Sequence, residues 1–361
     1  MSHLGLRILY HVINSRDDAS CERVFAPWDD MERLMRAHGI PLFALESRDE
    51  LRDFDILGFT LQYELSYSNV LNMLDLAGIN PLARERGEDG PLVCAGGPCA
   101  CNPMPMAPFI DFFVLGEGEE AIGDILDLYR SMKDEAAAAG KPDSVGRAEF
   151  LRRARLIDGV YVPSAARART FGPAAEPAPA SISAPAPASG AASEPTSASE
   201  PVSASASTSA SVSAPPSEFA SAPGAASESA SASGPASTPT SESAAEPAPA
   251  AEPVPMEARA RKRVVADMDA APFPDRGIVP FGEIVHDRVM LELFRGCIRG
   301  CRFCQAGYIY RPVRQKKPGA LVEQACALVD STGYEEISLT SLSTSDYSGL
   351  RELTDTLVPA M

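Results

Sequence analysis

Apolar positions in the first part of the chain follow two alternating patterns. In residues 3–14 they recur with helical spacing over much of the surface, which predicts a helix buried on more than one side. Short apolar runs then alternate with further helical segments. The runs predict strands over 21–26, 41–45, 55–61, 91–97 and 112–116, and the segments between them predict helices over 29–39, 69–76 and from 117–120 to about 131. Such alternation across short connections indicates an α/β fold with a parallel, doubly wound sheet.

The C-terminal part repeats this alternation. Residues 289–294 predict a short buried strand, and 318–333 predict a helix with its apolar positions facing inward. A second strand is predicted over 335–341 and a last helix over 349–357. We therefore expect two ordered regions, residues 1–165 and 258–361.

The segment between these regions, residues 173–254, has a different composition. It consists almost entirely of Ala, Ser, Pro, Glu, Thr and Gly, with one aromatic residue, Phe219, and no Lys, Arg or His. Such a segment cannot bury enough apolar surface to offset the entropy lost on ordering. It is predicted to be a long disordered insertion between two regions that otherwise pack together.

Charge and composition exclude several classes of protein. A net charge of −17 and a pI near 4.7 argue against a surface that coats nucleic acid. No run of some eighteen apolar residues is present, so we expect no membrane span, and the N-terminus lacks the features of a signal peptide. The eight cysteines cluster instead of spreading as disulfide staples, which favours a reducing, cytoplasmic location.

Three of these cysteines carry the strongest chemical signal. Cys297, Cys301 and Cys304 follow the predicted strand 289–294 at a C-x3-C-x2-C spacing, and a loop of this length can turn three sulfurs toward one point. Three thiolates suit an iron–sulfur cluster or zinc. A cluster held by three thiolates keeps one iron open for another ligand. The alternatives are a zinc knuckle with a fourth ligand elsewhere, for which His286 is a candidate, and a redox-inert trio.

Two glycine-containing turns and several other polar groups are weaker signals. The turns, Gly96-Gly97-Pro98 and Gly116-Glu117-Gly118-Glu119, could let backbone approach a ligand, but they are also ordinary turns after strands. A second metal site at Cys94, Cys99 and Cys101 is less expected than buried or loop thiols. Cations after the cysteine loop could steer carboxylates or phosphates, or could simply be solvated; they are Arg311, Arg314, Lys316 and Lys317.

The three cysteines, with aromatic Phe303 just before the last one, resemble the cluster motif of radical S-adenosylmethionine (SAM) enzymes. The resemblance implies a [4Fe–4S] cluster on Cys297, Cys301 and Cys304, with SAM bound at the open iron and Phe303 placed behind the adenine. It also implies that the strand 335–341 ends near SAM. Candidate SAM-binding residues there are Ser341, Ser343 and Asp346, which could equally be ordinary loop residues.

The order of elements before the motif resembles the class of radical SAM proteins with a B12-binding domain, and one uncharacterised subfamily in particular. Matching runs are Ser2–Gly5, Phe25–Trp28, Gln62–Tyr67 and Ala95–Pro98. The resemblance implies a flavodoxin-like, cobalamin-binding type of domain. Its candidate cobalamin contacts are Gly96, Gly97, Pro98, Gly116, Glu117 and Gly118. The Asp-x-His-x-x-Gly signature is absent, so His3 is interpreted as a surface or capping residue and not as a cobalt ligand.

Only 57 residues follow Cys304, whereas a complete (β/α)8 barrel takes about 250 residues. The resemblance therefore implies only the first βα units of a partial TIM-type radical SAM barrel, truncated within that domain. We expect radical hydrogen abstraction or methyl transfer on an unknown substrate, an electron donor of the flavodoxin or ferredoxin type, and a separate chain that completes the barrel. The rival hypotheses are a non-catalytic fragment and a metal-binding module with a structural or electron-transfer role.

Overall fold

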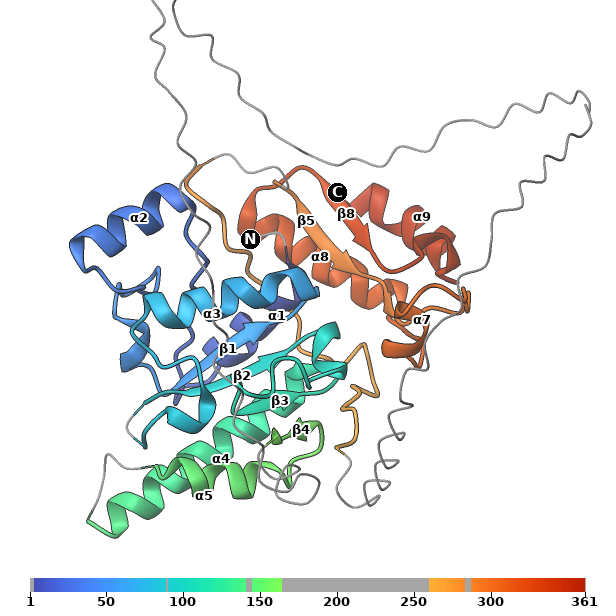
Figure 1. Cartoon of the computed structure of the whole chain (residues 1–361). Coiled ribbons are helices and arrows are strands. Elements are labelled where there is room, and N and C mark those ends of the chain that lie inside the picture. The colour runs from blue at the N-terminus through green and yellow to red at the C-terminus, as the bar shows by residue number, and fades with distance from the viewer. Residues whose placement is uncertain (1–2, 89, 141–144, 164–259, 283–286, 361) are drawn as a thin grey trace, which may run out of the picture. The chain divides into compact units, whose positions relative to one another are not determined.

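The computed structural model describes residues 3–88, 90–140, 145–163, 260–282 and 287–360 (Figure 1). Contacts group Met1–Gly172 with Ala251–Met361 into one compact unit. The predicted disordered insertion, 173–254, lies outside the described residues, and so does His286. Among the helices that the structure describes, none is both long enough and apolar enough to cross a membrane.

A four-stranded sheet organises the N-terminal region, in the order β1-β2-β3-β4. The strands β1 (Ile56–Thr60), β2 (Leu92–Gly96) and β3 (Phe112–Val114) are parallel, and β4 (Val160–Tyr161) pairs antiparallel with β3. Within the described strands the order follows the chain without a reversal. The predicted α/β class with a parallel sheet is confirmed.

Helices cover both faces of this sheet because successive side chains of β2 and β3 point to opposite sides. Val93, Ala95 and Phe113 belong to one core, with α2 (Asp29–His38) and α3 (Tyr67–Leu76). The neighbouring strand residues belong to a second core, with α4 (Gly118–Ala138) and α5 (Arg147–Ala154). The second core takes Leu92, Cys94, Phe112 and Val114 from the strands. Figure 1 shows α3 and α4 on opposite sides of the sheet.

The first helix, α1 (Leu4–Asn14), begins at His3, whose Nδ1 accepts a hydrogen bond from the backbone N–H of Leu6 at 3.1 Å. His3 is therefore an N-cap, as the sequence interpretation favoured. In the described part of the chain, short 3₁₀ turns join the larger elements: Leu51–Asp53, Glu64–Ser66, Ala83–Glu85, Pro98–Cys101 and Thr344–Asp346.

Two predicted strands are wrong. Residues 21–26 form no strand, and in 41–45 only Phe43 makes an isolated bridge, to Glu50. Their backbone groups are satisfied locally instead: the Cys21 N–H donates to the Asn14 side chain at 2.8 Å, and the Leu45 N–H donates to the Arg23 carbonyl at 2.9 Å. Apolar content alone therefore does not make a strand, because a strand also needs a backbone that pairs with it.

The C-terminal region is built on β5 (Val289–Glu292) and β8 (Ile337–Thr340), which pair in parallel. The connecting helix α8 (Pro318–Thr332) starts with a proline and ends at Gly333, whose φ is +72°. α8 and α9 (Leu350–Ala360) share one core with the two strands, so both predicted strands and both predicted helices are present. A small antiparallel pair, β6 (Phe294–Arg295) and β7 (Arg314–Gln315), and the one-turn helix α7 (Ala306–Ile309) lie between β5 and α8 in sequence.

Candidate metal and cofactor site

The cysteine loop, which carries Cys297, Cys301 and Cys304, follows β6 in the chain. Gly296, with φ of +95°, makes the turn, and a Cβ there would lie 2.9 Å from the Pro312 carbonyl oxygen. The chain can therefore turn outward only with glycine at this position. Cys301 is exposed, Cys297 and Cys304 are half-buried, and all three are free thiols. The Cys304 N–H donates to the Cys301 carbonyl at 3.1 Å, which folds the end of the loop into a turn.

The three thiols share one loop but do not surround one point. Across the part of the chain that the structure describes, no group of three or more His, Cys, Asp or Glu side chains is arranged as a metal site. The donor set itself fits a soft metal centre, because three free thiols within eight residues are what a thiolate-ligated cluster or zinc requires. To bind one metal centre, the three sulfurs would have to move closer together. That movement involves only a solvent-exposed loop and no residue of a hydrophobic core.

The loop after β8 meets the cysteine loop through an ion pair. Arg299, between Cys297 and Cys301, donates from Nε to Asp346 at 2.7 Å, and its Nη2 also contacts that carboxylate. Hydrogen bonds from Arg299 and Ser343 lower the pKa of Asp346. The structure therefore brings Ser343 and Asp346, two of the predicted SAM-binding residues, to the cysteine loop. The third, Ser341, hydrogen-bonds Thr344 at 3.1 Å, and Phe303 is 91% exposed.

The Gly96-Gly97-Pro98 turn lies at the carboxyl edge of the N-terminal sheet. Gly97 has a φ of +94°, and a Cβ on it would lie 2.8 Å from the Leu61 carbonyl oxygen. The Cys99 N–H donates to that carbonyl at 3.1 Å, so the turn is fastened to the end of β1. Here the close approach that glycine permits is to the protein's own backbone.

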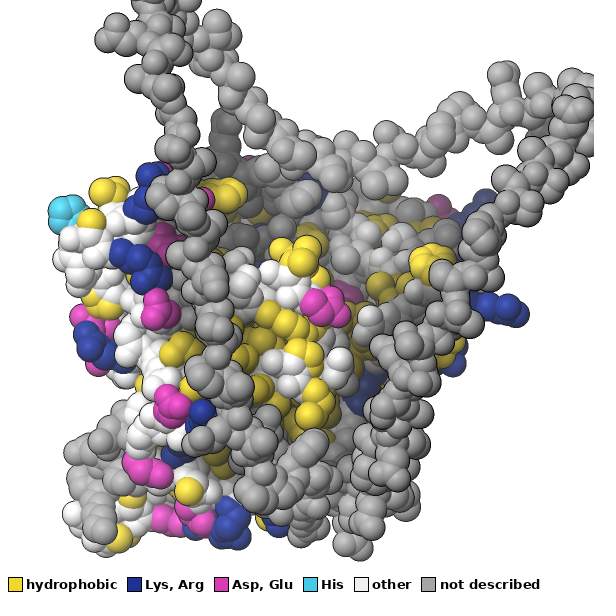
Figure 2. Space-filling model, viewed as in Figure 1, with side chains coloured by type: hydrophobic (Ala, Val, Ile, Leu, Met, Phe, Trp, Pro, Cys, Tyr) yellow, Lys and Arg dark blue, Asp and Glu magenta, His cyan; other side chains and the backbone are white. Residues whose placement is uncertain are grey.

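On the face drawn in Figure 2, hydrophobic side chains gather near the middle of the surface, with many charged ones toward its edges.

The Gly116-Glu117-Gly118 segment also contacts the chain itself. Gly116 forms a parallel bridge with Arg263, and a Cβ on Gly116 would lie 2.1 Å from the Arg263 carbonyl oxygen. A Cβ on Gly118 would lie 3.0 Å from Leu9 of α1. The space beside these predicted cobalamin contacts is thus filled by α1 and by the segment around Arg263.

Glu117 belongs to a largely buried set of five side chains that we call the charge network: Glu117, Glu119, Glu292, Arg295 and Arg314. Arg314 donates two hydrogen bonds to Glu117, at 2.7 and 2.5 Å, and the Val265 N–H donates a third at 2.5 Å. Arg295 reaches Glu119 at 2.5 Å and Glu292 at 2.8 Å. The network joins the first turn of α4 to β5, β6 and β7. Its member in β6, Arg295, lies two positions before Cys297 in the sequence.

Each charged side chain of the network is paired with a side chain of opposite charge. Burial alone would raise the pKa of Glu117, but the hydrogen bonds from Arg314 and Val265 and the nearby Arg295 lower it. The side chains of Glu119 and Arg295 are only 5% and 13% exposed, so each charge depends on its partners and not on water.

Lys316 is buried next to this network. Its side chain is 2% exposed, and its Nζ lies 3.8 Å above the centre of the Phe273 ring and 3.0 Å from Gln324 Oε1. Burial lowers the pKa of Lys316 to about 8, against the opposing charge of Glu292. Of the four cations proposed to steer anions, Arg314 and Lys316 are used internally. Lys317 pairs with Asp269 at 3.2 Å, and Arg311 lies over the Tyr308 ring.

The remaining cysteines do not form a second metal site. Cys94 and Cys99 lie in the two different cores, on opposite faces of the sheet. Burial raises the pKa of Cys94 to about 12 and raises the pKa of Cys99 and Cys101 as well. The interpretation of these thiols as buried or loop residues is therefore favoured.

The sequence interpretation missed Glu292 and Arg295. Glu292 stands within the predicted buried strand 289–294 and Arg295 directly follows it. That position is the signal that could have identified them, because a charged side chain in or beside a buried strand needs a buried partner.

Known proteins resemble parts of this chain. Residues 5–163 match the family model described as "Radical SAM proteins, N-terminal". An uncharacterized protein of Methanocaldococcus jannaschii is 38% identical over 82 residues, which are 22% of this chain but only 17% of that protein. No solved structure matches. The family match supports a radical SAM-related protein, and radical SAM proteins in general use a [4Fe–4S] cluster and SAM. The matched residues end before the cysteine loop.

Proposed function

We propose that this chain binds a [4Fe–4S] cluster through Cys297, Cys301 and Cys304 and holds SAM beside it. The observation that carries the proposal is a solvent-open loop with three free thiols, directly after a buried strand. The match of residues 5–163 to an N-terminal radical SAM family supports it independently, because that match does not include the cysteines.

When bound, the cluster and SAM supply one-electron cleavage of SAM, which permits hydrogen abstraction from a substrate. The chain's own residues have positioning roles. Arg299 and Asp346 hold the cysteine loop against the loop after β8. Ser341 and Ser343 offer hydroxyl groups on that same loop, and the exposed Phe303 ring offers an apolar surface for the adenine of SAM.

The N-terminal region is proposed to be a flavodoxin-like domain of the cobalamin-binding type. A parallel sheet with helices on both faces is compatible with it. Binding would have to use Gly96, Gly97 and Pro98, because Gly116, Glu117 and Gly118 already contact α1 and the residues around Arg263. Methyl transfer, in addition to hydrogen abstraction, depends on this part of the proposal.

The C-terminal region is proposed to provide the first units of a TIM-type barrel, namely β5, α8 and β8. An electron donor of the flavodoxin or ferredoxin type, a separate chain that completes the barrel and a cytoplasmic location belong to the same proposal, because a reduced cluster needs an electron source and a reducing compartment. The matched relative shares only 17% of its length with this chain, so the activity of the whole protein is also part of the proposal.

Anaerobic reconstitution with iron and sulfide tests the metal assignment. The protein should bind about four irons and four sulfides per chain, as a cubane cluster requires. Adding SAM to the reduced cluster should change its EPR spectrum, because SAM would occupy the iron that lacks a protein thiolate. One zinc ion with no acid-labile sulfide, or a cluster whose spectrum ignores SAM, would contradict the proposal.

A further inference from the structure

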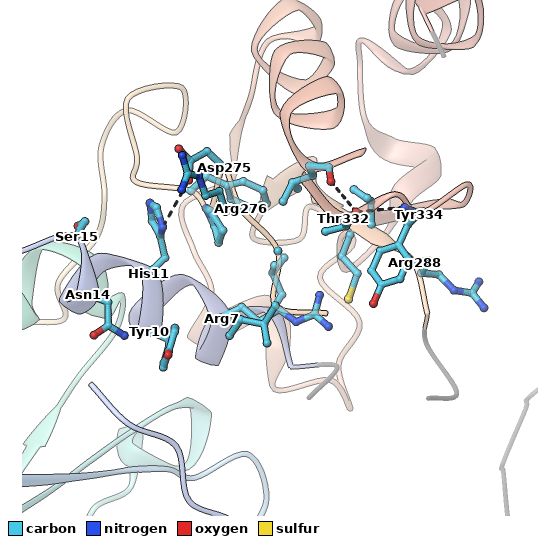
Figure 3. Close-up of a pocket in the computed structure, with 18 residues that line it drawn as sticks. Arg7, Tyr10, His11, Asn14, Ser15, Asp275, Arg276, Arg288, Thr332 and Tyr334 are labelled. Atoms are coloured by element: carbon cyan, nitrogen blue, oxygen red, sulfur yellow. Dashed lines mark hydrogen bonds and ion pairs between the residues drawn. The ribbon is translucent and has the colours of Figure 1, made fainter. Parts of the chain in front are cut away.

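A cavity of about 440 Å³ lies between α1 and the C-terminal region (Figure 3). In Figure 3, one wall comes from α1 and carries Arg7, Tyr10 and His11, while Thr332 and Tyr334 lie across the cavity from it. Residues 273–278, the start of β5 and the end of α8 complete the lining. A volume of this size is within the range of pockets that bind small molecules.

The inner surface of the cavity is mainly apolar. Leu4 contributes from α1, Phe273 and Ile278 from the preceding segment, and Val289 and Met290 from β5. A fully hydrated ion would lose its water there without compensation. The surface therefore suits the hydrocarbon part of a ligand.

The charged groups of the lining are mainly cationic. Among the described lining residues, Arg7, Arg276 and Arg288 are cationic, and Asp275, which lies 3.9 Å from His11 Nδ1, is the carboxylate. This balance is unusual in a chain with a net charge of −17. An arginine guanidinium matches the geometry of carboxylate and phosphate groups.

Arg288 is the group best placed to receive an anionic head. The Arg288 Nε is buried and has no hydrogen-bond partner within the described part of the chain. Its Nη1 reaches the exposed Glu336 only at 3.5 Å. A buried donor that lacks a partner is costly, and a ligand oxygen would supply the partner. Burial, and then the hydrogen bond and negative charge of Asp287, raise the pKa of Tyr334, whereas the positive charge of Arg7 lowers it, so Asp287 and Arg7 both act on this part of the cavity.

We propose that this cavity binds a small amphipathic anion, with an apolar body against Phe273 and Met290 and a carboxylate or phosphate head toward Arg7 and Arg288. The site is at the amino end of β5, whereas the cysteine loop follows its carboxyl end, so the two sites are separate. A ligand bound here contacts both α1 and β5, and by linkage it stabilises the folded chain.

Calorimetric titration of the full chain with four probes tests the proposal without any substitution. Decanoate and decyl phosphate carry both the apolar body and the anionic head; decanol lacks the charge, and inorganic phosphate lacks the body. At least one of the first two should bind about tenfold or more tightly than decanol and than inorganic phosphate, because charge-assisted hydrogen bonds and apolar burial both contribute. The tighter of the two identifies the head group. Equal binding of decanol, or no binding of either anion, would overturn the proposal.

Two substitutions locate the head group. Arg288→Gln and Arg7→Gln should each weaken binding of the preferred anion, Arg288→Gln by about tenfold or more. Arg351→Gln, an exposed position on α9, is the matched control and should leave affinity unchanged. Unchanged affinity in the folded arginine variants would refute the assignment. Replacing Cys297, Cys301 and Cys304 should not alter binding, which separates this site from the proposed cluster.

Discussion

The cysteine loop and the charge network are neighbours in sequence, but their surroundings differ. One residue separates Arg295 from Cys297, yet Arg295 is 13% exposed and bonded to two carboxylates, whereas Arg299 within the loop is 58% exposed. The thiols are reachable and have no metal-like arrangement. The network is largely buried, with every charge paired.

This difference separates residues that must exchange partners from residues that hold the structure in place. Thiols that bind a metal must be accessible to it, and their exposure to solvent costs little stability. Buried charges are stable only while each partner is present, so they fix the base from which the loop leaves. The Gly-Glu-Gly-Glu turn, which sequence likeness assigned to a cofactor, supplies two carboxylates of that base.

The largest expected effect concerns the thiols. Replacing any one of Cys297, Cys301 and Cys304 with Ala should abolish the reconstituted cluster, measured as iron and acid-labile sulfide per chain, because two thiolates do not hold a cubane. The unfolding midpoint of the metal-free protein should not change, since none of the three is buried. Replacing Cys326, or the buried Cys94, should leave iron binding intact. A cluster that survives loss of one loop cysteine would show that another residue is the ligand.

The next largest effect concerns the charge network. Arg295→Met should destabilise the chain by about 3–5 kcal/mol, because it leaves Glu119 and Glu292 buried without their common partner. Urea unfolding followed by circular dichroism measures the loss. Arg299→Met, in the exposed loop, is the control and should not shift the midpoint. If the two variants lost similar stability, the distinction between the regions would be wrong.

The buried Lys316 gives a pH dependence of known sign. Its pKa is lowered by burial to about 8, whereas in the unfolded chain it is about 10.4. Between these values the unfolded state holds a proton that the native state has released, so the contribution of Lys316 to stability rises with pH. The difference in unfolding free energy between wild type and Lys316→Met should grow in favour of wild type by on the order of 3 kcal/mol from pH 8 to 10.5. A difference that stays constant with pH would indicate a hydrated amine.

The smallest expected effect concerns the glycine beside the network. Gly116→Ala should cost about 1–3 kcal/mol, because its φ of +102° is unfavourable for alanine and the new Cβ would meet Arg263. Gly123→Ala, inside α4 with nothing near the added Cβ, is the matched control and should stabilise by about 0.5–1 kcal/mol. Thermal unfolding of the two variants measures both. Equal effects would mean that residue 116 does not approach the segment around Arg263 closely.

Local patterns in the sequence determined most of the elements. The apolar runs around β1, β2, β3, β5 and β8 are long enough to be recognised, and Gly333 marks the end of α8. The α/β class and the cysteine motif follow from residues that are close in sequence. Where an apolar run finds no partner strand, as at 21–26, the same reasoning fails, because a strand exists only through its neighbour.

Only the tertiary structure decided which charges meet. Glu117 is bonded to Arg314, 197 positions further along the chain, and Arg295 is paired with Glu119 of α4. The sequence places each of these residues in a loop or strand without indicating its partner, since pairing depends on the distance between side chains and not on their local pattern. The same is true of the cavity, whose walls come from α1 and from residues some 260 to 330 positions away. Burial makes such pairs necessary for stability, because a charge removed from water is stable only beside an opposite charge or a hydrogen-bond partner within the fold.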